Sequence, residues 1–408
     1  MNSNEKTLTR GKIIIISIAT FLLILALFTA ITIIMMVNRS EPTTNSNVDI
    51  AVSSDIAVSD ALQDASQTFA ESILTEVSES NKDEDLSSES DEESALDEIN
   101  HGWVINEYGY TYVYGDSGYE QFNFSNTVLE RYANSLNALV ECVPNGTRIF
   151  NITVPVSSTF ASIPRDIYVS DNFYNKSQSA FVSTVSTKLD DRIKNISIVS
   201  AMQEHFDSGE YLFYRTDKNW TSVGAYVAYK NFCENAGIVP YTLSNFIQKD
   251  VGDYLGSFYK ATNAEKMLEN PDRVICYATV PAVKTDLTVY DSGIVYTDYS
   301  LCENSVTEKN AYDIYLGTVA ERYEINTTAD GGSLLIIADS SAYPLVPLLA
   351  SHYRKIDVIN PKYFDTNINE FLEKRHYDDI ITMCYSTNAT SGDYIPAFNT
   401  MIGATIDG

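Results

Sequence analysis

Histidine and cysteine are scarce in this chain, and neither residue is clustered. Of 408 residues, 4 are histidines and 5 are cysteines, and no two cysteines stand in a Cys-x-x-Cys spacing. Zinc sites need several such ligands at close spacing, so we expect neither a metal site nor a cofactor. Most of the cysteines lie among apolar residues and should pack in the core. The sequence leaves a disulfide between Cys276 and Cys302 as an alternative to two free thiols.

Positive charge is also in short supply. Lysine and arginine total 27 against 55 acidic residues, for a net charge of −28. The segment from Glu41 to Glu98 carries −16 and the first 40 residues carry +3, which leaves −15 for residues 99–408. An acidic domain behind an acidic segment is poorly suited to bind nucleic acid or an anionic surface. Uncharged or amino sugars are easier partners.

One long apolar run stands near the N-terminus, over residues 13–37. As a helix it would extend roughly 37 Å, which is enough to cross a bilayer. The apolar core of a cleaved signal peptide is shorter, at about 7–15 residues. Lys6, Arg10 and Lys12 precede the run and only Arg39 closely follows it. We therefore predict a cytoplasmic N-terminus at 1–12, a single transmembrane helix at 13–37 and an extracellular C-terminal domain. A cleaved signal peptide or a buried helix is the alternative.

Residues 38–100 contain neither tryptophan nor tyrosine. The segment is rich in Ser, Thr, Asn, Asp and Glu, and Lys82 is the one basic residue between Glu41 and Glu98. So little apolar surface cannot offset the entropy lost on ordering the chain. We predict an acidic, disordered linker that holds the following domain away from the membrane.

Residues 101–408 read as one domain in which apolar strand patterns alternate with helical patterns. The clearest strand is the continuous apolar run 333–339, which is typical of a strand buried on both faces. Repeated strand–helix units predict an α/β fold with a doubly wound parallel sheet. Residues 240–330 are less regular and are expected to be an insertion or cap. Strands are expected at 148–154, 195–199, 333–339, 355–359 and 379–384, an edge hairpin within 108–119, and helices at 125–141, 176–190, 221–235, 342–352 and 367–375.

Two polar segments stand at the ends of predicted strands, where such sheets bind their ligands. The first is Asp339-Ser340-Ser341, after the most apolar strand. A serine here could be a nucleophile whose oxyanion is stabilised by neighbouring backbone N–H groups. Viewed alone, the segment favours the simpler interpretation that Ser340 or Ser341 caps the next helix.

The second segment is Thr216-Asp217-Lys218-Asn219-Trp220-Thr221. In a serine hydrolase an Asp-x-His pair activates the serine, because the histidine takes up its proton and the aspartate orients the imidazole. Asp217 can still accept hydrogen bonds, whereas the amide of Asn219 cannot act as a base.

The order of the two segments resembles the DHHW proteins of Gram-positive bacteria, named for a Thr-Asp-His-His-Trp-Thr motif. Those proteins are similar to the SGNH-hydrolase-like alginate O-acetyltransferases, and the resemblance covers roughly residues 103–400. It implies that Asp217 and Ser340 match the catalytic aspartate and serine, that Asn219 occupies the histidine position, and that Lys218 replaces the first histidine. The implied fold is a flavodoxin-like, three-layer SGNH domain.

Whether the chain is an enzyme therefore depends on Asn219. The favoured hypothesis is a degenerate, membrane-anchored protein that binds a cell-wall or surface glycan, with Lys218, Trp220 and Ser341 as candidate substrate-binding residues. The alternative is an active, serine-dependent O-acetyltransferase or acetylesterase of a surface polysaccharide, with Ser340 as nucleophile. The third hypothesis is that the chain is a scaffolding partner in an envelope complex. None of the four histidines (His101, His205, His352, His376) is expected to replace the missing base.

Overall fold

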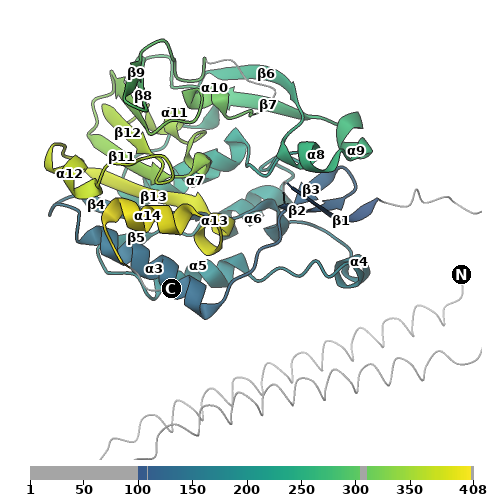
Figure 1. The fold of residues 1–408 in the computed structure, drawn as a ribbon. Coiled ribbons are helices and arrows are strands. Elements are labelled where there is room, and N and C mark those ends of the chain that lie inside the picture. The colour runs from purple at the N-terminus through teal and green to yellow at the C-terminus, as the bar shows by residue number, and fades with distance from the viewer. Residues whose placement is uncertain (1–99, 108, 304–309, 406–408) are drawn as a thin grey trace, which may run out of the picture. The chain divides into compact units, whose positions relative to one another are not determined.

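The computed structural model describes residues 100–107, 109–303 and 310–405 (Figure 1). These belong to one compact unit, Ala95–Gly408. The predicted transmembrane helix at 13–37 lies outside the described residues, as does all but the last residue of the predicted linker. In the part that is described, no helix has the length and apolar character needed to cross a bilayer.

A mixed sheet of eight strands forms the centre of the domain, in the order β5-β4-β13-β11-β12-β10-β8-β9. The five strands from β5 to β12 are parallel, and the other three continue the sheet in antiparallel pairs. The apolar run of β11 is almost wholly buried, as predicted for a strand covered on both faces. The strands are β4 (Arg148–Val154), β5 (Ile193–Asn195), β8 (Thr285–Asp291), β9 (Ile294–Tyr296), β10 (Arg322–Thr327), β11 (Ser333–Ala338), β12 (Lys355–Ile359) and β13 (Asp379–Tyr385).

The prediction of an all-parallel sheet is therefore wrong at one edge. Residues 285–327 were expected to cap the sheet, yet they supply its last three strands. Antiparallel neighbours need no helical crossover, so this stretch lacks the strand–helix alternation on which the prediction relied. The fold remains mixed α/β.

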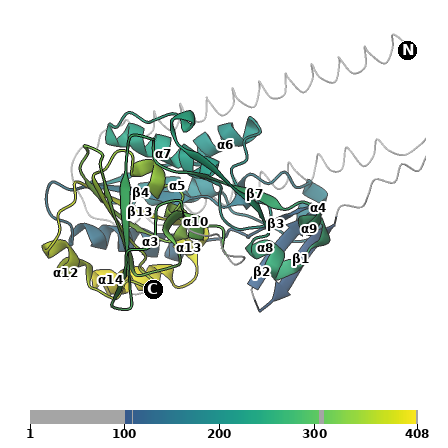
Figure 2. The ribbon, with the colours of Figure 1, turned by 90° about the horizontal axis from the view of Figure 1, so that it is seen from above.

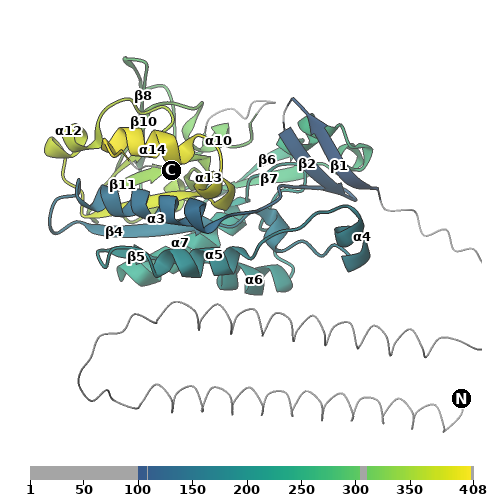
Figure 3. The same cartoon turned by 60° about the horizontal axis from the view of Figure 1, so that its bottom comes forward.

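Helices cover both faces of the sheet (Figure 2). On one face α3 packs against α13 and α14, which lie nearest the viewer in Figure 3, and on the other α7 packs against α6 and α11. Side chains cap the amino ends of α3 and α7: the hydroxyl of Ser125 accepts from Val128 N, and that of Thr221 accepts from Val223 N and Gly224 N. The helices are α3 (Asn126–Val140), α5 (Gln178–Ser186), α6 (Val199–Asp207), α7 (Ser222–Ala236), α11 (Val346–Leu349), α12 (Ile368–Glu373), α13 (Ser386–Thr390) and α14 (Tyr394–Ile402).

Two smaller sheets stand beyond the carboxyl ends of the parallel strands. The tyrosine-rich hairpin was expected at the edge of the main sheet, but it forms a separate antiparallel sheet that contacts α8. The elements are β1 (His101–Asn106), β2 (Gly109–Tyr114) and β3 (Ser117–Tyr119), then β6 (Gln248–Tyr254) paired with β7 (Asp272–Tyr277), and the short helices α4 (Arg165–Ser170), α8 (Ser257–Thr262), α9 (Glu265–Glu269), α10 (Asp313–Leu316), η1 (Ser157–Thr159), η2 (Leu243–Asn245) and η3 (Ser340–Ala342).

All five cysteines are free thiols. Cys276 and Cys302 are neighbours in the core, and burial together with Cys276 raises the pKa of the Cys302 thiol well above its usual value. The two sulfurs are thus adjacent without being bonded.

Candidate functional site

The end of β11 presents Asp339 and Ser340 at the carboxyl edge of the parallel strands. One carboxylate oxygen of Asp339 accepts from Ser341 N at 2.9 Å, and this contact caps the short helix η3. Its other oxygen accepts from Tyr385 N at 2.9 Å and from Asn388 Nδ2 at 2.6 Å. Ser340 is partly exposed, and within the described chain its hydroxyl has no hydrogen-bond partner. The aspartate is thus the capping group, which leaves the serine hydroxyl unengaged.

The second motif is anchored by Asp217, which is buried. Its Oδ1 accepts from Asn219 N at 2.9 Å, and its Oδ2 accepts from Ser257 N at 2.8 Å and from the Tyr254 hydroxyl at 3.2 Å. Gly256 lies so close that an added Cβ would stand 2.3 Å from Asp217 Cβ. Both carboxylate oxygens are therefore occupied by partners from the motif itself and from β6 and α8.

Trp220 and Tyr385 join the two motifs. The indole Nε1 of Trp220 donates to Ser341 O at 3.0 Å, and Trp220 N donates to the Tyr385 hydroxyl at 3.1 Å. Burial raises the pKa of Tyr385 well above its usual value, and the carboxylates of Asp339 and Asp217 act in the same direction. The structure thus brings together the segments that the sequence singled out, with Tyr385 between them.

Asn219 stands where the resemblance implies a histidine. Its side chain is 7% exposed, and its Oδ1 is buried without a hydrogen-bond partner in the described part of the chain. An amide does not take up a proton near neutral pH, so Asn219 cannot serve as a general base.

Two candidate substrate-binding residues do not fit that role. Trp220 is fully buried, so its ring has no free face against which a sugar could stack. Ser341 is also fully buried, and its hydroxyl lacks a partner among the described residues. Their function is to pack the junction of the motifs. Lys218 is exposed and stays a candidate for ligand contact.

None of the four histidines is hydrogen-bonded to Asp217, Asn219 or Ser340 in the described residues. His352 contacts the Tyr229 hydroxyl at 2.6 Å and stacks on Tyr241. His101 pairs with Asp171 and His205 with Glu210. His376 is exposed near the amino end of β13, away from the carboxyl edge. In the described ranges no group of three potential metal ligands is found.

Glu120 is a site residue that the sequence analysis missed. It follows β3, whose Gly118 N donates to Arg215 O at 2.8 Å, just before the motif. Glu120 is partly buried, and this desolvation raises the pKa of its carboxyl above the ordinary value, with Asp217 and Asp339 adding to the effect and Lys218 opposing it. No local pattern marks this residue, because its placement depends on how the small sheet docks.

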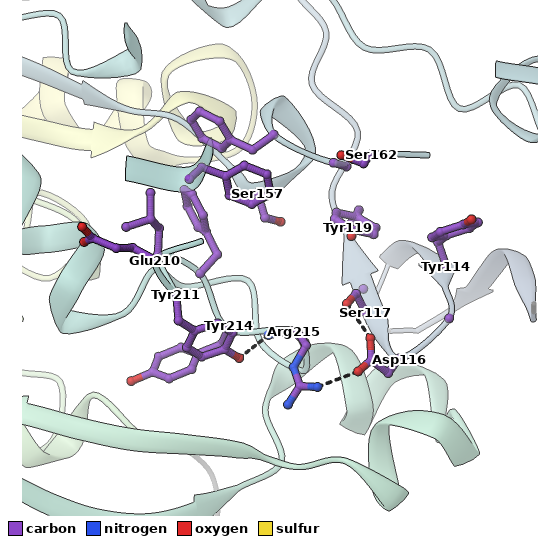
Figure 4. Close-up of a pocket in the computed structure, with 17 residues that line it drawn as sticks. Tyr114, Asp116, Ser117, Tyr119, Ser157, Ser162, Glu210, Tyr211, Tyr214 and Arg215 are labelled. Atoms are coloured by element: carbon purple, nitrogen blue, oxygen red, sulfur yellow. Dashed lines mark hydrogen bonds and ion pairs between the residues drawn. The ribbon is translucent and has the colours of Figure 1, made fainter. Parts of the chain in front are cut away.

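Two cavities adjoin the small sheet. One, of about 490 Å³, is lined by Trp103, Ile105, Tyr110, Glu120, Gln121, Thr387 and Ser391. The other, of about 470 Å³, is lined by residues 114–119 and 210–215 together with side chains that follow β4 (Figure 4). Arg215 pairs with Asp116 across that second cavity. Only the first cavity includes Glu120.

Comparison with solved structures supports the fold. A DHHW family protein from Eubacterium siraeum is 23% identical, with a TM-score of 0.64 over 75% of this chain and 98% of its own. Bacillus cereus PatB1, solved with a sulfonyl adduct, is 13% identical, with a TM-score of 0.55 over 74% and 98%. The O-acetyltransferase domain of Pseudomonas putida AlgJ is 11% identical over 73% and 99%, with a TM-score of 0.38. For the first two of these structures, the likeness at such identities is one of fold alone.

No curated protein matches the sequence. The family model described as DHHW protein matches residues 60–359, which include both motifs. This match spans well over half of the sequence, and the chain therefore belongs to the DHHW protein family.

Proposed function

We propose that this chain is a membrane-anchored, cell-surface member of the family whose SGNH-like domain binds a surface glycan and has lost serine-hydrolase chemistry. Asn219 is the observation that carries the proposal. It occupies the position of the base, its oxygen is buried, and both oxygens of Asp217 are already engaged by other donors. Removing a general base typically lowers turnover about 10²–10⁴-fold.

An esterase assay tests the loss of chemistry. Full-length wild-type protein and Ser340→Ala, compared on an aryl acetate, are expected to show the same background rate. Because PatB1 was solved with a sulfonyl adduct, a sulfonyl fluoride is a suitable second probe. Intact-mass spectrometry should find no adduct on Ser340. Turnover or labelling that disappears with Ser340→Ala would overturn the proposal.

The anchor is supported by the apolar run at 13–37 and by the basic residues that precede it. The domain that follows would face the cell exterior and be associated with the envelope. The protein should stay with the membrane on alkaline extraction, and protease added to intact cells should digest its C-terminal domain. Release into the alkaline supernatant would contradict the anchor.

Glycan binding is favoured over a scaffolding role because cavities lined by aromatic and polar side chains stand at the carboxyl edge of the sheet. The negative charge of the domain favours uncharged or amino sugars over acidic ones. A glycan array probed with the full-length protein separates the two roles. Binding of any uncharged or amino-sugar glycan supports the proposal, and an empty array favours scaffolding.

A second candidate function is favoured by Glu120. A carboxyl with a raised pKa beside Asp217 and Asp339 is suited to accept a proton. In that case the chain would be an O-acetyltransferase or acetylesterase. Glu120 would take the proton of Ser340 as the serine oxygen attacks the acyl carbon of an acetyl ester, and it would return that proton to the alcohol that leaves when the ester C–O bond breaks. Attack on the acetyl-serine by a sugar hydroxyl or by water would then release the acetyl group and regenerate Ser340. Turnover by wild-type protein that is lost in both Ser340→Ala and Glu120→Gln would establish this alternative.

A further inference from the structure

The cavity between the β1–β2 hairpin and α13 has the features of a sugar subsite. We infer that it binds one uncharged or amino sugar unit of the glycan, and that it discriminates against uronic acids. This inference rests on the proposed glycan binding and names the place and the class of ligand. At about 490 Å³ the cavity is within the usual size range of small-ligand sites.

The hairpin supplies an apolar wall. Ile105 and Tyr110 are 64% and 70% exposed, which is unusual for large apolar side chains, and both line the cavity. Trp103 lies beside them, with its indole held by a hydrogen bond to Asp171 O at 2.7 Å. Aromatic rings pack well against the C–H face of a sugar. Exposed apolar groups gathered at one cavity indicate a binding surface.

The other residues that line the cavity are polar. The carboxylate of Glu120 has no hydrogen-bond partner in the described part of the chain. The amide nitrogen of Gln121 donates to Tyr174 O at 2.8 Å, which fixes the group and leaves its oxygen free to accept. Thr387 and Ser391 add hydroxyls from α13 and its C-terminal end. These acceptors and donors match the hydroxyl groups of a sugar.

The charged groups near the cavity determine which class of sugar it favours. Glu120 lies within electrostatic reach of Asp217 and Asp339, and the nearby cation is Lys218. A carboxylated sugar placed beside Glu120 would face three carboxyl groups, whereas an ammonium or a hydroxyl would be stabilised there. Acidic sugars are therefore disfavoured.

A hydrogen bond also connects the wall of the cavity to the Asp339-Ser340-Ser341 segment. Thr387 precedes Asn388, whose amide donates to Asp339 at 2.6 Å. This hydrogen bond links α13, which lines the cavity, to the segment that carries Ser340. By contrast, the charged groups of the second cavity are already paired, Asp116 with Arg215 and Glu210 with His205.

Trp103 makes the inference testable with the intact protein. The sequence has two tryptophans, and Trp220 is fully buried, so a ligand in this cavity should change the fluorescence of Trp103. Full-length protein in detergent would be titrated with chitopentaose, a chitosan oligomer and an oligomannuronate. We expect the first two to alter the emission and the third to have no effect. Tyr110→Ala and Glu120→Gln should weaken binding at least ten-fold, whereas Tyr363→Ala, at an exposed tyrosine outside this cavity, should not.

The outcomes test the sugar subsite and the proposed glycan binding separately. Chito-oligosaccharide binding that is unchanged in Tyr110→Ala and Glu120→Gln would overturn the subsite and leave glycan binding standing. Preference for the oligomannuronate would overturn the charge selection. Absence of binding by all three probes would overturn both. Since Tyr110 is 70% exposed, its truncation should leave the fold intact, which a thermal melt of the variant verifies.

Discussion

The indole nitrogen of Trp220 donates a hydrogen bond to the backbone carbonyl of Ser341 at 3.0 Å. The two residues are 121 positions apart in the sequence. Each is adjacent to the residue that the family resemblance places in the catalytic site, Asn219 in one segment and Ser340 in the other. The distance between the motifs is therefore fixed by a buried contact that involves no ligand.

Trp220→Phe should loosen this junction. The substitution keeps an aromatic ring but leaves the carbonyl of Ser341 buried without its donor, which typically costs about 1–3 kcal/mol. Urea unfolding should show a lower midpoint with an unchanged slope. An unchanged midpoint would mean that the contact does not contribute to stability.

Asn219→His should restore the Asp-x-His pair and create esterase activity. A histidine here could accept the proton of Ser340, and general-base catalysis typically contributes about 10²–10⁴-fold. The rate on an aryl acetate should rise with pH through the usual histidine pKa, about 6.5. Asn219→Gln, which adds length without a base, is the matched control and should stay inactive.

The esterase activity gained by Asn219→His must depend on Ser340. Combining Asn219→His with Ser340→Ala should return the rate to background. A folded Asn219→His protein without activity would show that Ser340 and position 219 do not face one another in reactive geometry.

Glu120→Gln should stabilise the protein at neutral pH. Because the folded state raises the pKa of this carboxyl, its contribution to stability is fully present below the unfolded pKa, about 4.3. That contribution is lost as pH rises through the folded pKa. Melting temperatures of variant and wild type should coincide near pH 4 and separate above it, with the variant higher. A wild type that is more stable at pH 7 would contradict the assignment.

His352→Gln should change the response of the fold to acid. Burial lowers the pKa of His352 to about 4, so its contribution is present above the unfolded pKa, about 6.5. The unfolded chain takes up the proton first, and stability falls between these two values. The wild type should therefore lose stability relative to the variant as pH drops from 6.5 to 4, measured by thermal melts. Parallel curves across this range would show that His352 does not titrate as described.

Local chemistry predicted several parts of the fold correctly. The buried strand β11 follows from its continuous apolar run, and the helix expected at 221–235 matches α7. The antiparallel edge strands were not foreseen, since short strands of mixed character leave sheet membership to tertiary pairing. α6 was missed as well, because the residue that precedes it makes no side-chain cap.

The site was predictable only where a motif marked it. Asp217, Asn219 and Ser340 stand in recognisable segments, so their meeting could be expected. Tyr385 and Glu120 could not be found in this way, because each reaches the site through strand order and sheet docking. Trp220 was predicted to contact a ligand, but its ring is buried. The burial depends on tertiary packing against Ser341 and Tyr385, which no local pattern indicates.

The pairing of β1 with β2 also determines how the domain would respond to force. The chain enters the domain at His101, which pairs with Tyr114 at the open end of the hairpin. In a chain anchored as we propose, tension in the linker would load this end, and the ladder would separate one pair at a time. Trp103 would leave the wall of the cavity before Ile105 does. The affinity of the cavity for the glycan would thus decrease under tension, as in a slip bond.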